Sequence, residues 1–194
     1  RLEYRGYDSS GIALLKDDEI KLFKKEGKVA NLEDFVASKD NSGTRCIGHT
    51  RWATHGPPND KNAHPHLSED GDIALVHNGI IENYDVLRQE LESKGYHFNS
   101  DTDTEVLCYL IADIKKKTGN KLGKSVRLAL QQVVGAYAIV VMSIDEPNKL
   151  IAARKSSPLV LGIGEDNDFY VASDATPIVE YTKQVVYLND GEIA

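Results

Sequence analysis

The sequence predicts an α+β domain in which two packed β-sheets have helices on their outer faces. Segments typical of strands come first, three segments with helical periodicity follow, and strands return before the end of the chain. One late segment, residues 138–142, is continuously apolar, as expected for a strand that is covered on both faces. The length of 194 residues fits a single domain, 1–194, with a proper core.

The first part of the chain is expected to be mostly strands. Residues 11–15 and 20–24 read as a β-hairpin, residues 32–37 as a short helix and residues 44–52 as a strand. Residues 57–66 contain three prolines and are expected to be a surface excursion without regular structure. Residues 72–77 read as the next strand, which Asn78-Gly79 is expected to stop.

Three helices are expected next, because capping residues bound each apolar periodicity. The first is capped by Asn83 and ends at Gly95, and its inward-facing residues are predicted to be Val86, Leu87 and Leu91. The second has Thr102 as the N-cap of a capping box and ends at Gly119. The third covers about residues 122–134. Strands are then expected at residues 137–144, 150–154, 159–163, 169–172 and 185–188.

Composition excludes several classes of protein. The net charge of −7 argues against a nucleic-acid partner, because phosphate binding needs a basic face. No apolar run approaches the roughly 18 residues that span a bilayer, so no membrane association is expected. The two cysteines, Cys46 and Cys108, have no metal-ligand spacing, which favours a reduced, cytoplasmic setting.

Residues 48–56 are the densest group of directional side chains in the chain. Arg51 and Trp52 lie there with two hydroxyls and two imidazoles, on the strand end and just after it. Such a set suits a site that binds a small zwitterion. The alternative is a polar loop that only turns the chain.

Two further segments offer groups for the same purpose. Asn78-Gly79 is either a tight turn or a pair of N–H donors for an oxyanion. Asp103 lies in the first turn of a helix, where the macrodipole stabilises a carboxylate, and it is also an acceptor for an ammonium group. With the Arg51 guanidinium on a carboxylate, Asp103 would complete a receptor for a free amino acid.

Metal and phosphate sites are weaker interpretations. His64-Pro65-His66 resembles the H-x-H of metal hydrolases, but no carboxylate or third histidine has helical ligand spacing. Gly162-Ile163-Gly164 is too short for a phosphate loop and no lysine follows it. No metal and no cofactor is expected.

Five separated motifs resemble one known family. They are residues 2–13 (LEYRGYDSSGIA), 49–56 (HTRWATHG), 76–83 (VHNGIIEN), 100–106 (SDTDTEV) and 154–160 (RKSSPLV). Together they closely resemble the glutaminase domain of the glucosamine-6-phosphate synthases, which are class II glutamine amidotransferases. The resemblance covers essentially the whole chain and is very specific.

The resemblance implies a four-layer α/β/β/α fold of the N-terminal-nucleophile hydrolases, which agrees with the layers predicted above. It also implies a role for each of eight residues. Arg51 would bind the glutamine α-carboxylate with help from Thr54 and His55, and Asp103 would hold the α-ammonium. Asn78 and the Gly79 N–H would form the oxyanion hole. Trp52 would act as a lid that gates ammonia, and Arg5 would help to position the nucleophile.

The nucleophile that the resemblance implies is an N-terminal cysteine on a strand before Arg1. We therefore expect the sequence to be an excerpt that binds glutamine or glutamate but does not hydrolyse glutamine. The resemblance also implies C-terminal sugar-isomerase domains that bind fructose 6-phosphate, and a homo-oligomer when full length. Alternatives are another class II amidotransferase or a catalytically silent amino-acid-binding domain.

Overall fold

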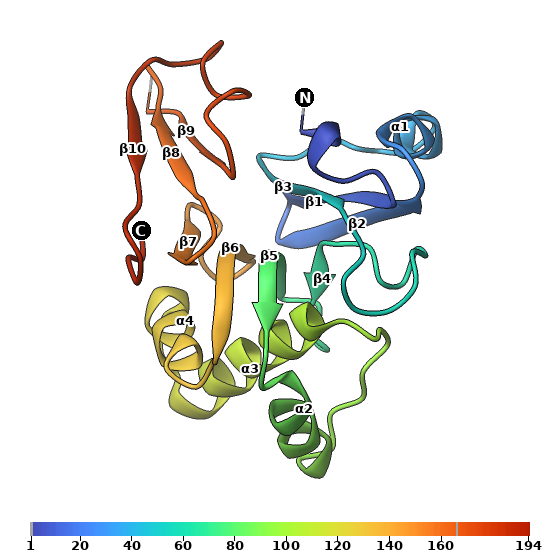
Figure 1. Ribbon diagram of the computed structural model, residues 1–194, viewed down its shortest axis with the longest axis vertical. Coiled ribbons are helices and arrows are strands. Elements are labelled where there is room, and N and C mark those ends of the chain that lie inside the picture. The colour runs from blue at the N-terminus through green and yellow to red at the C-terminus, as the bar shows by residue number, and fades with distance from the viewer. Residues whose placement is uncertain (1, 166) are drawn as a thin grey trace.

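The computed structural model describes residues 2–165 and 167–194, and it contains antiparallel sheets packed in layers with helices (Figure 1). Arg1, with which the sequence begins, lies outside the described residues. The next residues form a short 3-10 turn, η1 (Glu3–Arg5). The α+β class predicted from the order of the segments is thus confirmed.

The N-terminal sheet has the strand order β2-β1-β3. Its strands are β1 (Ser9–Lys16), β2 (Glu19–Glu26) and β3 (Arg45–Arg51). Asp17 and Asp18 join the first two with positive φ angles of 49° and 61°, which suit the tight turn of a hairpin. Helix α1 (Val29–Val36) contacts this hairpin, and the Lys25 Nζ lies 5.6 Å from the ring centroid of Phe35 in α1.

The central sheet has the order β4-β5-β6-β7. It consists of β4 (His66–Leu67), β5 (Ile73–Ile81), β6 (Gly135–Ser143) and β7 (Leu150–Lys155). Ile139 and Val141 of β6 belong to the core beneath the helices, whereas Ala138, Val140 and Met142 belong to the core on the other face. The continuously apolar run therefore arises because both faces of β6 are covered, as predicted.

Helices α2 (Tyr84–Ser93), α3 (Asp103–Thr118) and α4 (Leu122–Leu130) cover one face of the central sheet (Figure 1). The predicted caps of α3 are confirmed: the Thr102 hydroxyl accepts a hydrogen bond from the Glu105 N–H at 3.2 Å, and Gly119 ends the helix at φ 64°. A glycine adopts this left-handed conformation without the steric penalty of a side chain.

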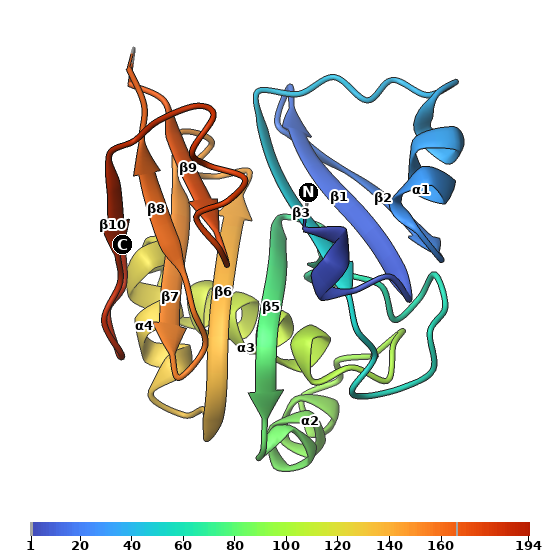
Figure 2. The ribbon, with the colours of Figure 1, turned by 45° about the horizontal axis from the view of Figure 1, so that its top comes forward.

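A third sheet, with the order β10-β8-β9, is formed by β8 (Val160–Ile163), β9 (Phe169–Ala172) and β10 (Val185–Tyr187). Side chains of this sheet and of the N-terminal sheet share one core with the face of the central sheet that is turned away from α3. Figure 2 shows β8, β9 and β10 on the left of the view and β1, β2 and β3 on the right, with β6 and β5 between them.

The expectation that Asn78-Gly79 stops its strand is wrong. Strand β5 continues through both residues to Ile81, with Asn78 opposite Ala138 and Gly79 opposite Tyr137 in β6. Gly79 has φ 129°, and a Cβ there would lie 2.1 Å from the Ala136 carbonyl oxygen. The glycine is therefore required by the close approach of β6 rather than by a hairpin turn.

Three other expectations need correction. Val86 is 66% exposed, so the inward face of α2 is formed by Leu87 and Leu91 without it. Asn83 precedes α2 but its side chain makes no capping bond, and instead its amide bonds the backbone of residues 132 and 134. Residues 62–64 and 66 are buried, so the proline-rich segment is not wholly a surface excursion.

Candidate active site

A cavity of about 270 Å³ opens where β3, β5 and the N-terminus of α3 meet the segment after β9. This is close to the lower end of the roughly 300–1,000 Å³ range of small-molecule sites. Seven of the eight candidate residues from the sequence line it, namely Arg5, Arg51, Trp52, Thr54, Asn78, Gly79 and Asp103. His55 is not among the lining residues.

Arg51, the last residue of β3, has its guanidinium fixed by the loop that follows. It is 3% exposed, and its Nη atoms donate to the carbonyl oxygens of His55, Gly56 and Pro57, the last two at 3.4 Å. Burial lowers the pKa of Arg51 from its ordinary value, while the charges of Asp8 and Asp103 act in the opposite direction. The contacts hold the guanidinium in one place at the cavity wall.

Asp103 is the first residue of α3, and its carboxylate is also buried, with 4% exposure. Its Oδ2 accepts a hydrogen bond from the Ile81 N–H at 2.8 Å, so one oxygen is held by the end of β5. Only half of the predicted capping box forms, because the Glu105 carboxylate accepts from the Ser100 N–H at 2.7 Å and the Ser100 hydroxyl at 2.6 Å, whereas the Thr102 N–H donates to the Ser100 hydroxyl. These bonds still fix the backbone in front of α3.

Asn62 joins the Arg51 loop to the start of α3. Its side chain is fully buried, and its amide nitrogen donates to the Pro57 carbonyl at 3.0 Å and to Asp101 Oδ2 at 3.2 Å. Its amide oxygen accepts from the Asp101 N–H at 3.0 Å. This amide therefore links the loop that holds Arg51 to the residues just before α3. We did not predict this residue, because neither spacing nor periodicity singles it out.

Asn78 projects from β5 toward β3. Its Oδ1 lies 2.7 Å from the Nε2 of His49, which is paired with Gly11 in the N-terminal sheet. Both residues line the cavity. The contact connects two sheets through side chains at the position where an oxyanion donor is expected.

Four histidines surround these groups, and burial lowers the pKa of each. The pKa of His49 falls to about 4, those of His64 and His66 lie well below the ordinary value, and that of His77 is lowered although the nearby Asp103 charge opposes the change. Neutral imidazoles are consequently expected at pH 7. His66 Nε2 is 3.0 Å from the Thr102 hydroxyl, and His77 Nδ1 is 3.0 Å from the Thr104 hydroxyl, on either side of Asp103.

The remaining candidates lie at the rim. Trp52 is 59% exposed and packs edge-to-face on Tyr7, with ring centroids 5.4 Å apart. The Arg5 Nη1 donates to the Ser173 carbonyl at 3.1 Å and so connects η1 to the segment after β9. The His55 ring packs on Tyr84 at 5.1 Å. The structure thus brings the carbonyl of His55, not its ring, to Arg51.

Neither cysteine is placed to act as a nucleophile. Cys108 is fully buried in α3, where burial raises the pKa of its thiol well above the ordinary value. Desolvation also raises the pKa of the Cys46 thiol, although the residue as a whole is exposed. Neither is among the residues that line the cavity. A reactive thiol needs a lowered pKa, so both sites are unsuited.

The His64-Pro65-His66 segment places two imidazoles 5.0 Å apart, in an edge-to-face arrangement. Within residues 2–165 and 167–194, no group of three or more His, Cys, Asp or Glu side chains is arranged to hold a metal ion. In the same ranges every helix is too short or too polar to cross a membrane.

Comparison with known proteins identifies the family. Residues 49–193 match the profile described as a glutamine amidotransferase domain. The chain belongs to this family. Among curated relatives of this glutamine amidotransferase domain, the glutamine–fructose-6-phosphate aminotransferase (isomerizing) of Bacteroides thetaiotaomicron is 60% identical over 195 residues, which cover 100% of the chain and 32% of the relative. The enzyme of the same name from Aquifex aeolicus is 50% identical, with 100% and 32% coverage.

The chain therefore spans about a third of the length of these relatives. Among solved structures, the glutamine phosphoribosylpyrophosphate amidotransferase of B. subtilis has a TM-score of 0.80 and 29% identity, and the match covers 99% of the chain and 41% of that protein. The layered α+β architecture of the amidotransferase domain is that of the N-terminal-nucleophile hydrolases, as the motifs predicted.

Proposed function

We propose that the chain is the glutamine-binding and glutamine-hydrolysing part of an enzyme that converts fructose 6-phosphate to glucosamine 6-phosphate. One observation carries the proposal: Arg51, Asp103 and the Asn78-Gly79 pair, which are distant in sequence, line the same small cavity. A guanidinium, a carboxylate and an amide donor are the three groups that a glutamine substrate requires.

The glutamine backbone would bind between Arg51 and Asp103. The two Nη atoms of Arg51 make three contacts to backbone carbonyls. Because a guanidinium has five N–H donors, donors remain for a carboxylate. Asp103 Oδ2 accepts from the Ile81 N–H at 2.8 Å, and Oδ1, which accepts a longer bond of 3.4 Å from the Thr104 hydroxyl, is the oxygen we assign to the ammonium. We assign Thr54 to the pocket for the glutamine α-carboxylate. We assign His55 to the same pocket through its carbonyl group, which accepts from Arg51.

The chemistry would take place beside β5. We propose that a cysteine upstream of Arg1 supplies the thiolate, with its own α-amino group as the base. The sulfur adds to the glutamine amide carbon, and the oxyanion accepts hydrogen bonds from the Asn78 Nδ2 and the Gly79 N–H. The C–N bond breaks, protonated nitrogen leaves as ammonia, and water hydrolyses the thioester to glutamate. Arg5 would position the cysteine segment, because it joins η1 to Ser173 at the cavity rim.

The sugar-phosphate acceptor is proposed from the relatives. Identity of 60% to a glutamine–fructose-6-phosphate aminotransferase, against 29% to a phosphoribosylpyrophosphate amidotransferase, favours the former over the latter. Trp52 is exposed at the cavity rim, and we assign it the role of a gate for ammonia toward domains that would follow Ala194. A homo-oligomer and a cytoplasmic location belong to the same proposal.

The test uses the longer protein that carries this domain, with its native N-terminus. Release of glutamate from glutamine and formation of glucosamine 6-phosphate are measured at varied glutamine. Arg51→Ala and Asp103→Asn are expected to raise the KM for glutamine about 10- to 100-fold, because a charge-assisted contact is worth roughly 1.5–3 kcal/mol. Arg127→Ala, at an exposed position of α4, is the control.

Unchanged glutamine saturation in both variants would overturn the receptor assignment, and absence of glutamate release by the wild-type protein would overturn the function. The 194-residue chain alone is expected to bind glutamate, as measured by calorimetry, without hydrolysing glutamine. Turnover of glutamine by this chain alone would contradict the upstream cysteine.

A further inference from the structure

We propose that His49 is a positioning residue that fixes the Asn78 side chain with its NH2 group facing the cavity. The inference rests on the proposed glutaminase chemistry and adds to it a residue to which we assigned no role from the sequence. It starts from the 2.7 Å contact between His49 Nε2 and Asn78 Oδ1.

The contact determines which ring nitrogen carries the proton. An amide oxygen only accepts hydrogen bonds, so Nε2 of His49 must be the donor. Since burial keeps the pKa of His49 near 4, the ring is neutral at pH 7 and its Nδ1 carries a lone pair. That Nδ1 is enclosed and has no hydrogen-bond partner among the described residues.

The reverse orientation of the amide is less stable. If the Asn78 NH2 group faced His49, Nε2 would have to accept and the proton would move to the enclosed Nδ1. A buried N–H donor without a partner is rarer and costlier than an acceptor in the same position. The contacts therefore select one of the two amide orientations, and in that orientation the NH2 group is available to an oxyanion.

The surroundings hold the His49 ring in place. It lies 4.5 Å from the His64 ring, centroid to centroid, and its backbone is paired with Gly11. The charged and titratable groups that act on it are His64, His66, His77 and Arg51, which oppose protonation of the ring, whereas the Asn78 side chain and the His77 backbone carbonyl favour it. A neutral donor at this position fixes the amide without placing a second positive charge beside the cavity.

The expected effect is on the chemical step and not on glutamine binding. His49→Leu fills the position with an apolar side chain and removes the Nε2–H donor. The Asn78 amide is then expected to sample both orientations. Removing an oxyanion donor altogether lowers kcat by about 10²–10³. We therefore expect kcat for glutamate release to fall about 10- to 100-fold in His49→Leu, with the KM for glutamine within about twofold.

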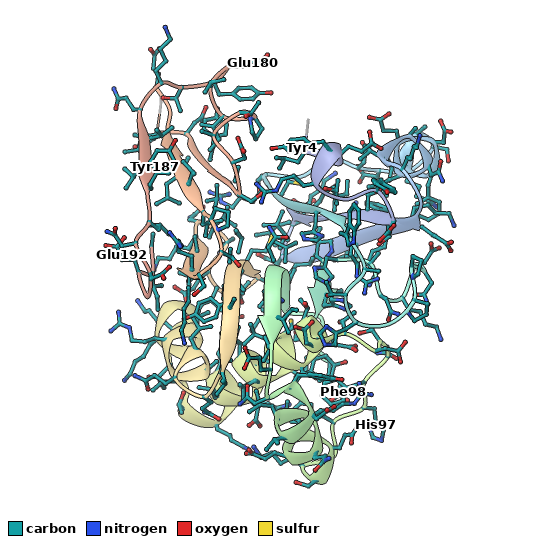
Figure 3. All side chains as sticks on the ribbon, in the orientation of Figure 1. Tyr4, His97, Phe98, Glu180, Tyr187 and Glu192 are labelled. Atoms are coloured by element: carbon teal, nitrogen blue, oxygen red, sulfur yellow. The ribbon has the colours of Figure 1, made fainter. Side chains whose placement is uncertain are left out.

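His49→Gln is the conservative variant, because its Nε2–H reaches a similar position, and it is expected to restore kcat to within about threefold of the wild type. His97→Gln is the matched control. Its side chain is 90% exposed, and Figure 3 shows it at the opposite end of the molecule from Tyr4 in η1. This variant is expected to retain the wild-type kcat and KM.

A double-mutant cycle separates positioning from general damage to the fold. In an Asn78→Ala background, His49→Leu has no amide left to orient and is expected to lower kcat no further. A full additional loss in that background, an unchanged kcat in His49→Leu, or a His49→Gln enzyme as slow as His49→Leu would each overturn the proposal.

The proposal also has a readout that does not require turnover. In the 194-residue chain, ¹⁵N-resolved NMR of the histidine rings is expected to show the proton of His49 on Nε2. A proton on Nδ1 would overturn the positioning role even if the enzyme is active. Absence of glutamate release by the wild-type protein would instead overturn the proposed function.

Discussion

Mild acid is expected to unfold this domain, because it has four buried histidines whose pKa values lie below the ordinary value. They are His49, His64, His66 and His77, and burial is the main cause in each case. The unfolded chain binds protons at these rings near pH 6.5, whereas the folded chain does so only at lower pH. The contribution of these neutral histidines to the free energy of unfolding is thus complete above about pH 7, and it is lost as the pH falls toward 4.

The magnitude follows for His49, whose pKa falls from 6.5 to about 4. Between pH 7 and pH 5 this difference removes about 2 kcal/mol from the free energy of unfolding. The other three histidines act in the same direction. Since a typical domain has about 5–15 kcal/mol in total, the loss is a large fraction of the whole. Carboxylates titrate mostly below this window, near pH 4.

The assay is urea denaturation of the 194-residue chain, followed by circular dichroism at half-unit steps from pH 7.5 to pH 5. His64→Leu is expected to reduce the slope of stability against pH by up to about 1.4 kcal/mol per pH unit, the limit for one proton. His97→Gln, which removes an imidazole that is 90% exposed, is the control variant. A stability that is flat between pH 7 and pH 5, or an equal slope in His64→Leu, would refute the reasoning.

Three further predictions concern single residues. Gly79→Ala is expected to abolish stable folding or glutamate release, because the new Cβ would lie 2.1 Å from the Ala136 carbonyl oxygen; normal expression and activity would contradict this close approach. Thr102→Ala removes the N-cap bond to the Glu105 N–H and is expected to cost about 1 kcal/mol, or roughly 2–4 °C in Tm by calorimetry, whereas Thr102→Ser should retain most of it. Asn62→Ala is expected to raise the KM for glutamine more than it lowers kcat, because it frees the loop after β3 from the N-terminus of α3; a loss confined to kcat in steady-state assays would argue against that link.

Local signals predicted much of the fold. The cap at Thr102, the glycine at 119 and the apolar run of β6 each specify structure within a few residues, and the structure agrees with all three. The continuation of β5 through Asn78-Gly79 was not predictable in the same way. Asn-Gly favours a turn locally, but pairing with residues 137 and 138 continues the strand, and this partner lies far along the sequence.

The candidate site shows the same division. Residue types identified Arg51, Asp103 and Asn78-Gly79 as groups that could bind an amino acid, and the family resemblance added the other candidates. Seven of the eight line one cavity. The groups that hold them in place, Asn62 and His49, were not predicted as such. Their partners are backbone atoms and side chains of other segments, so their importance depends on tertiary contacts that no periodicity reveals.

The walls of the cavity belong to different layers, and this has a consequence for motion. Arg51 lies on a strand of the N-terminal sheet, whereas Asn78 lies on the central sheet and Asp103 on a helix beneath it. An amino acid bound to all three would cross-link the layers. At 100 times its Kd, such a ligand adds about 2.7 kcal/mol to stability. Amide hydrogen exchange in β3 and β5 should then slow together on ligand binding, so exchange rates in these two strands measure how tightly the sheets are held to one another.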